Sequence, residues 1–168
     1  MLAKNLIELP RHPKFNPGTG AGKSSGFGRT RLFELLERYE LWDDTLKLAD
    51  TMYLESRDQP AEQVKRLRLI GLAQAGLGNK EKLAQTISLL QKQSIKPGAT
   101  PEPKVKAGGK GPKGGIPTLD ASAARDNAVK ELQMLEKLLA DETKDALELV
   151  KSLKGVSQAR HARYYLQA

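Results

Sequence analysis

Residues 70–84 read Ile-Gly-Leu-Ala-Gln-Ala-Gly-Leu-Gly-Asn-Lys-Glu-Lys-Leu-Ala, and this segment predicts the architecture more directly than any other. From Val64 onward, apolar residues recur at the short spacing that is typical of one face of an α-helix. Gly78 can end that helix in the left-handed conformation, and Asn79 can cap the next one. Because the connection is short, we expect the two helices to pack antiparallel.

The same periodicity recurs on both sides of this pair. In chain order the expected helices cover residues 29–39, 43–52, 60–77, 80–93, 120–139, 143–153 and 157–168. Several begin at a capping side chain such as Asp43 or Ser157, and Asp141-Glu142 marks a turn between two of them. No segment alternates apolar and polar residues in the way that a half-buried strand does. The sequence therefore predicts an all-α fold built from antiparallel helix hairpins.

Composition divides the chain into four segments. Residues 1–28 are rich in proline and glycine and are expected to be extended or disordered, whereas residues 29–93 form a first helical unit. Residues 94–118 contain six glycines, five prolines and five lysines, and predict a disordered linker. Residues 119–168 form a second helical unit, which is expected to be incomplete at its C-terminus because its last helix has no partner along the chain.

The formal net charge of +8 lies entirely in two segments rich in glycine and proline. Residues 1–30 carry five basic residues and one acidic residue, and residues 94–118 carry five lysines and one glutamate, which gives +4 for each segment. A folded surface for phosphate groups would need the opposite arrangement. We therefore expect no specific nucleic-acid partner, while weak and salt-sensitive contact of these segments with polyanions stays open.

Several classes of chemistry are excluded or disfavoured. The chain has no cysteine, which excludes disulfides, thiolate metal sites and thiol redox chemistry on this chain. No apolar run is long enough to span a membrane, and the N-terminus lacks the features of a secretory signal, so the cytoplasm is the default location. The two histidines are isolated, and acidic pairs are better explained as helix caps. We predict no catalytic residue, metal or cofactor.

Residues 17–25 read Pro-Gly-Thr-Gly-Ala-Gly-Lys-Ser-Ser and differ by one residue, Pro17, from a phosphate-binding loop. Such a loop needs a buried strand before it and a helix beginning at its lysine, here Lys23. The residues before it cannot form a buried strand, and Gly26 and Gly28 disfavour a helix that starts at Lys23. We interpret the segment as a flexible lead-in and keep a nucleotide-dependent enzyme as a rival hypothesis.

The segment 70–84 resembles the tetratricopeptide repeat. Gly71 and Gly78 have the spacing of the small residue and the turn glycine of that family, and Asn79 follows in the turn. The family usually has alanine where this chain has Leu83. The resemblance implies a solenoid of helix pairs in which the small residue, Gly71, lets the second helix of its pair approach.

Residues 28–44 and 51–55 resemble the helical region of large bacterial proteins that combine a thioredoxin-like redoxin domain, sometimes an NHL-type propeller, with tetratricopeptide-like repeats. The resemblance covers roughly residues 5–93 and, weakly, 125–168. It implies that this chain corresponds to the helical region only and carries none of the redoxin's chemistry. We expect that the natural chain continues, that a partner covers the last helix, or that the reading frame is a fragment.

These observations predict a non-catalytic helical-repeat scaffold that binds a protein or peptide partner, or supports neighbouring domains of a longer chain. The alternative is an accessory helical region of a redoxin-type protein whose catalytic domain lies elsewhere. Large side chains near the helix junctions are the candidates for partner binding. They are Tyr39, Trp42, Tyr53, Arg66, Tyr164 and Tyr165.

Overall fold

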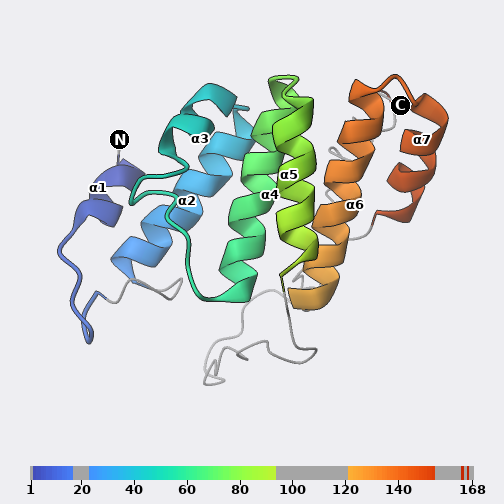
Figure 1. The fold of residues 1–168 in the computed structure, drawn as a ribbon. Coiled ribbons are helices and arrows are strands. Elements are labelled where there is room, and N and C mark those ends of the chain that lie inside the picture. The colour runs from blue at the N-terminus through green and yellow to red at the C-terminus, as the bar shows by residue number, and fades with distance from the viewer. Residues whose placement is uncertain (1, 17–22, 94–120, 154–163, 165, 167–168) are drawn as a thin grey trace, which may run out of the picture.

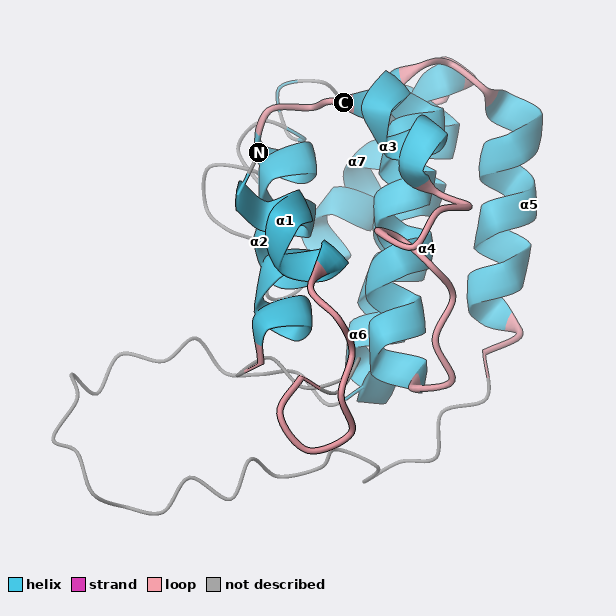
Figure 2. Ribbon diagram, turned by 90° about the vertical axis from the view of Figure 1, so that its left-hand side faces the viewer, coloured by secondary structure: helices cyan, strands magenta, loops and turns pink. Residues whose placement is uncertain are grey.

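The computed structural model describes residues 2–16, 23–93, 121–153, 164 and 166. In these residues the regular secondary structure is helical, apart from one isolated β-bridge between His12 and Asn16 (Figure 2). The predicted all-α class is therefore confirmed. The helices are α1 (Leu2–Glu8), α2 (Ser24–Arg38), α3 (Trp42–Leu48), α4 (Pro60–Gly76), α5 (Lys80–Gln91), α6 (Ala121–Leu139) and α7 (Thr143–Ser152).

The helices follow one another across the molecule in chain order, from α1 at one end to α7 at the other (Figure 1). α2, α4 and α6 run in the same direction, whereas α5 and α7 run in the opposite one (Figure 1). α5 packs on α4, α6 packs on both of them, and α7 packs on α6. Residues of the predicted units 29–93 and 119–168 therefore share one core, in which Leu132 of α6 packs with Leu72 and Leu83.

The turn between α4 and α5 forms as the sequence predicts. Gly78 takes a φ of 71°, and the N–H of Asn79 donates to the carbonyl of Gln74 at 2.8 Å, which closes the end of α4. The Asn79 side chain does not cap α5 and instead donates to Gln74 Oε1 at 2.9 Å. The predicted turn at Asp141-Glu142 also forms, with Asp141 at a φ of 61°.

The closest neighbour of Gly71 belongs to another helix than the one that the tetratricopeptide resemblance implies. A Cβ atom at this position would overlap the methyl groups of Leu132, which belongs to α6 and not to α5, the second helix of the pair. The absent side chain therefore brings the two parallel helices α4 and α6 together. A single sequence cannot reveal this, because Leu132 lies beyond the linker.

The expectation of an extended or disordered lead-in over residues 1–28 is wrong for two helical parts of it. Leu2–Glu8 forms α1, and α2 begins at Ser24 instead of near Arg29. α1 packs across Gly28 so closely that a Cβ there would lie 2.7 Å from the carbonyl oxygen of Ala3. The buried contact offsets the entropy that glycine costs in a helix.

The second predicted helix ends early, because α3 stops at Leu48 and does not continue to Met52. The guanidinium of Arg66 donates to the carbonyls of Ala49 and Leu54, at 2.9 and 2.5 Å, and so holds the chain in a turn after α3. The linker at 94–118 and most of the helix predicted at 157–168 lie outside the described residues. No helix among the described residues is long and apolar enough to cross a membrane.

Candidate functional site

Four side chains from separate elements meet in one polar network, which we call the Arg68 network. Arg68 of α4 donates through Nε and Nη2 to both carboxylate oxygens of Glu131 in α6, the Nη2 contact being 2.8 Å. The same Nη2 reaches Glu37 Oε1 of α2 at 3.0 Å. Tyr164, far along the chain, donates its hydroxyl to Glu131 Oε1 at 2.7 Å. The network thus joins the three parallel helices to a residue near the C-terminus.

In this network one guanidinium pairs with two carboxylates, and the side chains are largely shielded from solvent. The Glu131 side chain is only 1% exposed, and those of Arg68 and Glu37 are 21% exposed. Burial by itself would lower the pKa of Arg68, but the charges and hydrogen bonds of Glu131 and Glu37 outweigh burial and raise that pKa above its ordinary value. A guanidinium so held stays charged, so the network can fix helices, and the Glu131 carboxylate can accept a hydrogen bond from a hydroxyl group.

A second group of basic side chains lies at the N-terminal end. Arg29 of α2 is buried and donates to the backbone carbonyls of Tyr53 and Glu55, at 3.2 and 2.7 Å. Burial first, and then the nearby positive charge of Arg57, lower the pKa of Arg29 to about 10. We call Arg11, Arg29 and Arg57 the arginine cluster. Arg57 belongs to the loop that leads from α3 to α4, and Arg11 and Arg29 contact Glu55 of the same loop.

The residues predicted to bind a partner lie at separate places. Tyr39 ends α2 and is 64% exposed, with Arg38 over its ring at 5.9 Å. Trp42 is partly buried between two apolar clusters, and its indole covers Gly76 so closely that no Cβ would fit there. Of these two, only Tyr39 offers a free ring edge at the surface.

The remaining candidates make contacts within the chain. Tyr53 donates its hydroxyl to a carboxylate oxygen of Glu8 and so attaches α1 to the rest of the molecule. Arg66 binds the carbonyls after α3, and Tyr164 is buried in the Arg68 network. Tyr165 lies outside the described residues. The structure does not gather the five described candidates into one surface.

The segment that resembles a phosphate-binding loop needs one correction. A helix does start beside Lys23, because α2 begins at Ser24 with Lys23 as its N-cap residue. The segment before it turns back on itself between His12 and Asn16 and forms no buried strand, and Asn16 Oδ1 accepts the N–H of Ser25 at 3.1 Å. Residues 17–22 lie outside the described part of the chain, so the flexible lead-in stays our interpretation there and nucleotide binding stays a rival hypothesis.

Sequence reasoning missed Arg68 and Glu131, although a signal was present. Arg68 stands one helical turn from both Val64 and Leu72, so it occupies a position on the apolar face of α4. Glu131 adjoins Leu132 and lies three residues after Ala128, both of them buried. A charged residue on an apolar face, with an opposite charge on the apolar face of another helix, predicts a buried pair.

No group of three potential metal ligands of the His, Cys, Asp or Glu type gathers in the part of the chain that the structure describes. Comparison of the chain with protein-family models, curated proteins and solved structures gave no match.

Proposed function

We propose that this chain is a non-catalytic helical scaffold that binds a segment of a partner protein beside the Arg68 network, in the space that the Tyr164 ring fills between α6 and α7, which we call the groove. The observation that carries the proposal is the double contact of Tyr164, a residue that belongs to neither helix. Its ring packs with Met134 of α6 and with Ala146 and Val150 of α7, while its hydroxyl reaches Glu131. The groove therefore accepts a side chain that is apolar along its length and has a hydrogen-bond donor at its tip.

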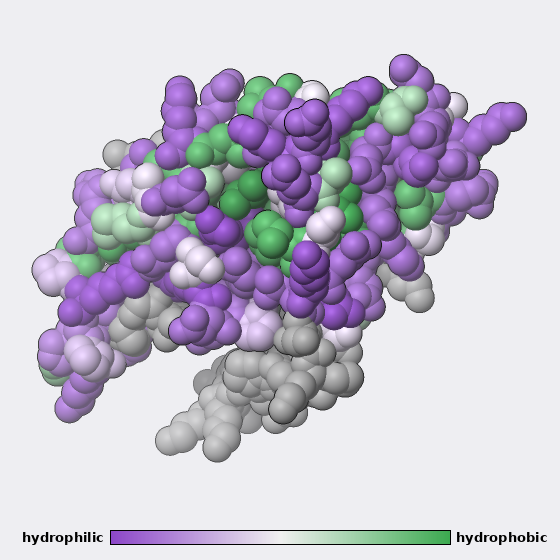
Figure 3. All heavy atoms as spheres, viewed as in Figure 1, coloured by the Kyte–Doolittle hydropathy of each residue, from purple (hydrophilic) through white to green (hydrophobic). Residues whose placement is uncertain are grey.

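The arrangement of the helices supports a role in recognition. Helix pairs placed in sequence give an extended surface to which each pair contributes, as in helical-repeat proteins. The face seen in Figure 3 is largely hydrophilic, with hydrophobic residues showing near its middle. A partner segment with an aromatic hydroxyl side chain would bind by exchanging with Tyr164, because both would use the same acceptor on Glu131.

The proposal is tested by asking whether an added peptide binds in the groove. A Tyr164→Ala variant of the full chain leaves the groove empty, so a labelled synthetic peptide with the sequence of residues 160–168 can bind there without having to displace Tyr164. We expect this variant to bind the peptide saturably in fluorescence polarisation, with a dissociation constant on the order of micromolar. A Leu166→Ala variant is the matched control, since Leu166 is 89% exposed and its removal leaves Tyr164 in place.

A second peptide, in which phenylalanine replaces the tyrosine that corresponds to Tyr164, should bind the empty groove more weakly, because it has no hydroxyl group to donate to Glu131. A folded Tyr164→Ala variant that binds neither peptide would mean that the groove only packs this chain's own residue. Circular dichroism establishes whether the variant is folded. The accessory role in a redoxin-type protein stays a prediction, which a redoxin reading frame adjoining this one would favour.

A further inference from the structure

The arginine cluster directs three guanidinium groups at one short stretch of loop. Arg11 Nη2 lies 2.7 Å from Glu55 Oε1, and Arg57 Nη2 lies 3.7 Å from the same oxygen. Arg29 Nη2 donates to the backbone carbonyl of Glu55 at 2.7 Å. The carboxylate of Glu55 thus stands within ion-pair distance of Arg11 and Arg57, while Arg29 holds the backbone of the same residue.

Two of these arginines are buried with donors unused. The Arg57 side chain is 8% exposed, and its Nη2 has no hydrogen-bond partner in the part of the chain that the structure describes. The Nε of Arg29 and the hydroxyl of Ser25, one turn apart on α2, are buried without a partner in the same way. Buried donors without partners cost free energy, so those of the neighbouring Arg29 and Arg57 point to an acceptor that binds there.

Positive charge is in excess at this place. Burial lowers the pKa of Arg57, and the neighbouring Arg11 lowers it further, against the opposing effects of Glu55 and Glu62. At Arg29 the charge of Glu62 opposes the fall in pKa more than that of Glu55 does. Glu62 is itself bound by Lys65 at 2.9 Å, whereas Glu55 is in direct ion-pair contact with Arg11 and Arg57. A ligand with two negative charges would balance the cluster better than one carboxylate does.

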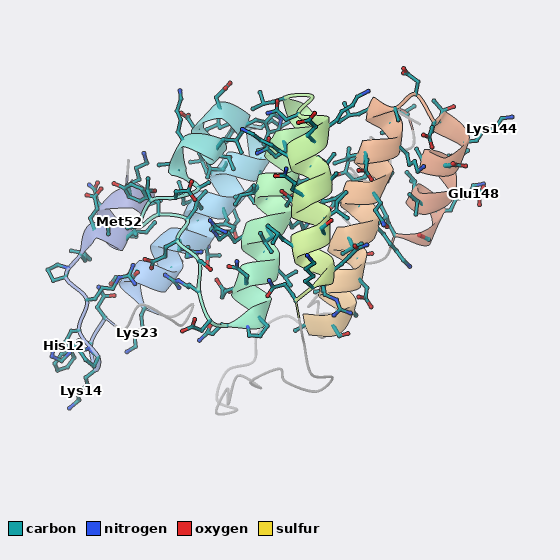
Figure 4. All side chains as sticks on the ribbon, viewed as in Figure 1. His12, Lys14, Lys23, Met52, Lys144 and Glu148 are labelled. Atoms are coloured by element: carbon teal, nitrogen blue, oxygen red, sulfur yellow. The ribbon has the colours of Figure 1, made fainter. Side chains whose placement is uncertain are left out.

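We propose that Arg11, Arg29 and Arg57 form a binding site for phosphate or for a phosphoryl group on a larger ligand, at the position that the Glu55 carboxylate occupies. The planar guanidinium fork matches the oxygens of a phosphate, and a phosphate supplies more acceptors than a carboxylate. The Glu55 side chain is 35% exposed and can turn outward to admit the ligand. Lys14 and Lys23 lie at the same end of the molecule (Figure 4) and would attract an anion to it.

The test is a titration of the full-length chain with inorganic phosphate, O-phosphoserine and AMP at constant ionic strength. The side-chain Nε–H signals of the arginines are followed by nuclear magnetic resonance and assigned with the variants. We expect saturable shifts for Arg29 and Arg57 with phosphate and none with chloride. Tighter binding of phosphoserine or of AMP would identify a modified protein or a nucleotide as the source of the phosphoryl group, and tightest binding of phosphate would identify the free anion.

Two substitutions must act in opposite directions. Glu55→Gln removes the competing carboxylate charge and should lower the dissociation constant for phosphate about tenfold, whereas Arg57→Gln should raise it by about the same factor. Arg11→Gln, at a side chain 38% exposed, replaces Arg57→Gln if the latter does not fold. Glu34→Gln is the matched control, because Glu34 pairs with Arg31 on the exposed face of α2 and should leave the constant unchanged.

The proposal fails if phosphate and chloride produce the same unsaturable shifts, or if Glu55→Gln binds phosphate no better than the natural chain. Either result would mean that the cluster serves only to hold the loop between α3 and α4. Equal effects of Glu34→Gln and Glu55→Gln would also overturn it, because they would reflect net charge alone.

Discussion

At the centre of the molecule Arg68 meets two carboxylates, whereas at the N-terminal end Arg29 meets two backbone carbonyls and a second guanidinium. Both side chains are largely or wholly buried, yet their surroundings shift their pKa in opposite directions: that of Arg68 rises above its ordinary value and that of Arg29 falls to about 10. The difference lies in whether the partners carry charge.

Charged partners and backbone partners serve different purposes. The carboxylates that surround Arg68 belong to α2 and α6, so their ion pairs with Arg68 join helices. The carbonyls that surround Arg29 belong to a loop, so the arginine fixes the loop through uncharged acceptors, and the charges of Glu62 and Glu55 offset burial only in part. We therefore expect stability to depend on the first centre and ligand binding on the second.

The largest expected effect is a difference in stability between two variants, each of which lacks one carboxylate from one of the two centres. Glu131→Gln leaves Arg68 with Glu37 alone and should lower the free energy of unfolding by about 3 kcal/mol, because the pair is buried. Glu55→Gln should cost less than about 1 kcal/mol, because that side chain is partly exposed and its pair is screened by solvent. Urea unfolding followed by circular dichroism measures both.

A loss for Glu55→Gln as large as that for Glu131→Gln would contradict the assignment of stability to the central network. Glu136→Gln, elsewhere on α6, controls for the removal of a charge from that helix.

The close approach of α4 and α6 gives the next effect in size. Gly71→Ala forces a methyl group against Leu132 and should cost about 2 kcal/mol through overpacking. Combining it with Leu132→Ala should cost less than the sum of the two single changes, because the smaller side chain makes room for the methyl group. Additive losses in thermal or urea unfolding would show that Gly71 and Leu132 are not in contact.

The sequence predicted the region from Pro60 to Gln91 well because its signals are local. Proline at the start of α4, Gly78 at its end and regular apolar spacing act within a few residues of one another. The same reasons account for the Asp141-Glu142 turn. Helices of this kind can be predicted without knowing what they pack against.

The N-terminal region could not be predicted in the same way, because its structure depends on contacts between remote residues. α1 is held by packing on Gly28 and by the bond from Tyr53 to Glu8, and α3 is cut short by Arg66. The Arg68 network likewise joins residues 63 positions apart. Local propensity contains no information on such pairs, and here tertiary contacts decide the helix bounds.

The two tight turns allow a finer comparison. Gly78 and Asp141 both take left-handed backbone conformations, but only the first has the residue type that does so without strain. Gly78→Ala should cost about 1 kcal/mol, and Asp141→Gly should gain somewhat less than that. Thermal unfolding of the two variants measures the difference, and a loss for Asp141→Gly would show that its side chain contributes more than its backbone strain costs.

The smallest effect concerns the attachment of α1 and is a dependence on pH. The hydrogen bond from Tyr53 to Glu8 raises the pKa of the Tyr53 hydroxyl above its ordinary value of 10.0, so the folded chain keeps this proton when the unfolded chain has lost it. Stability from this bond is therefore complete below pH 10 and is lost as the pH rises through the higher folded value. Tyr53→Phe should be slightly less stable at neutral pH, and its free energy of unfolding in urea should decline less steeply at alkaline pH.

Tyr39→Phe, at the exposed end of α2, is the matched control and should keep the alkaline decline of the natural chain. Identical alkaline curves for both variants would show that the bond does not hold α1 in place.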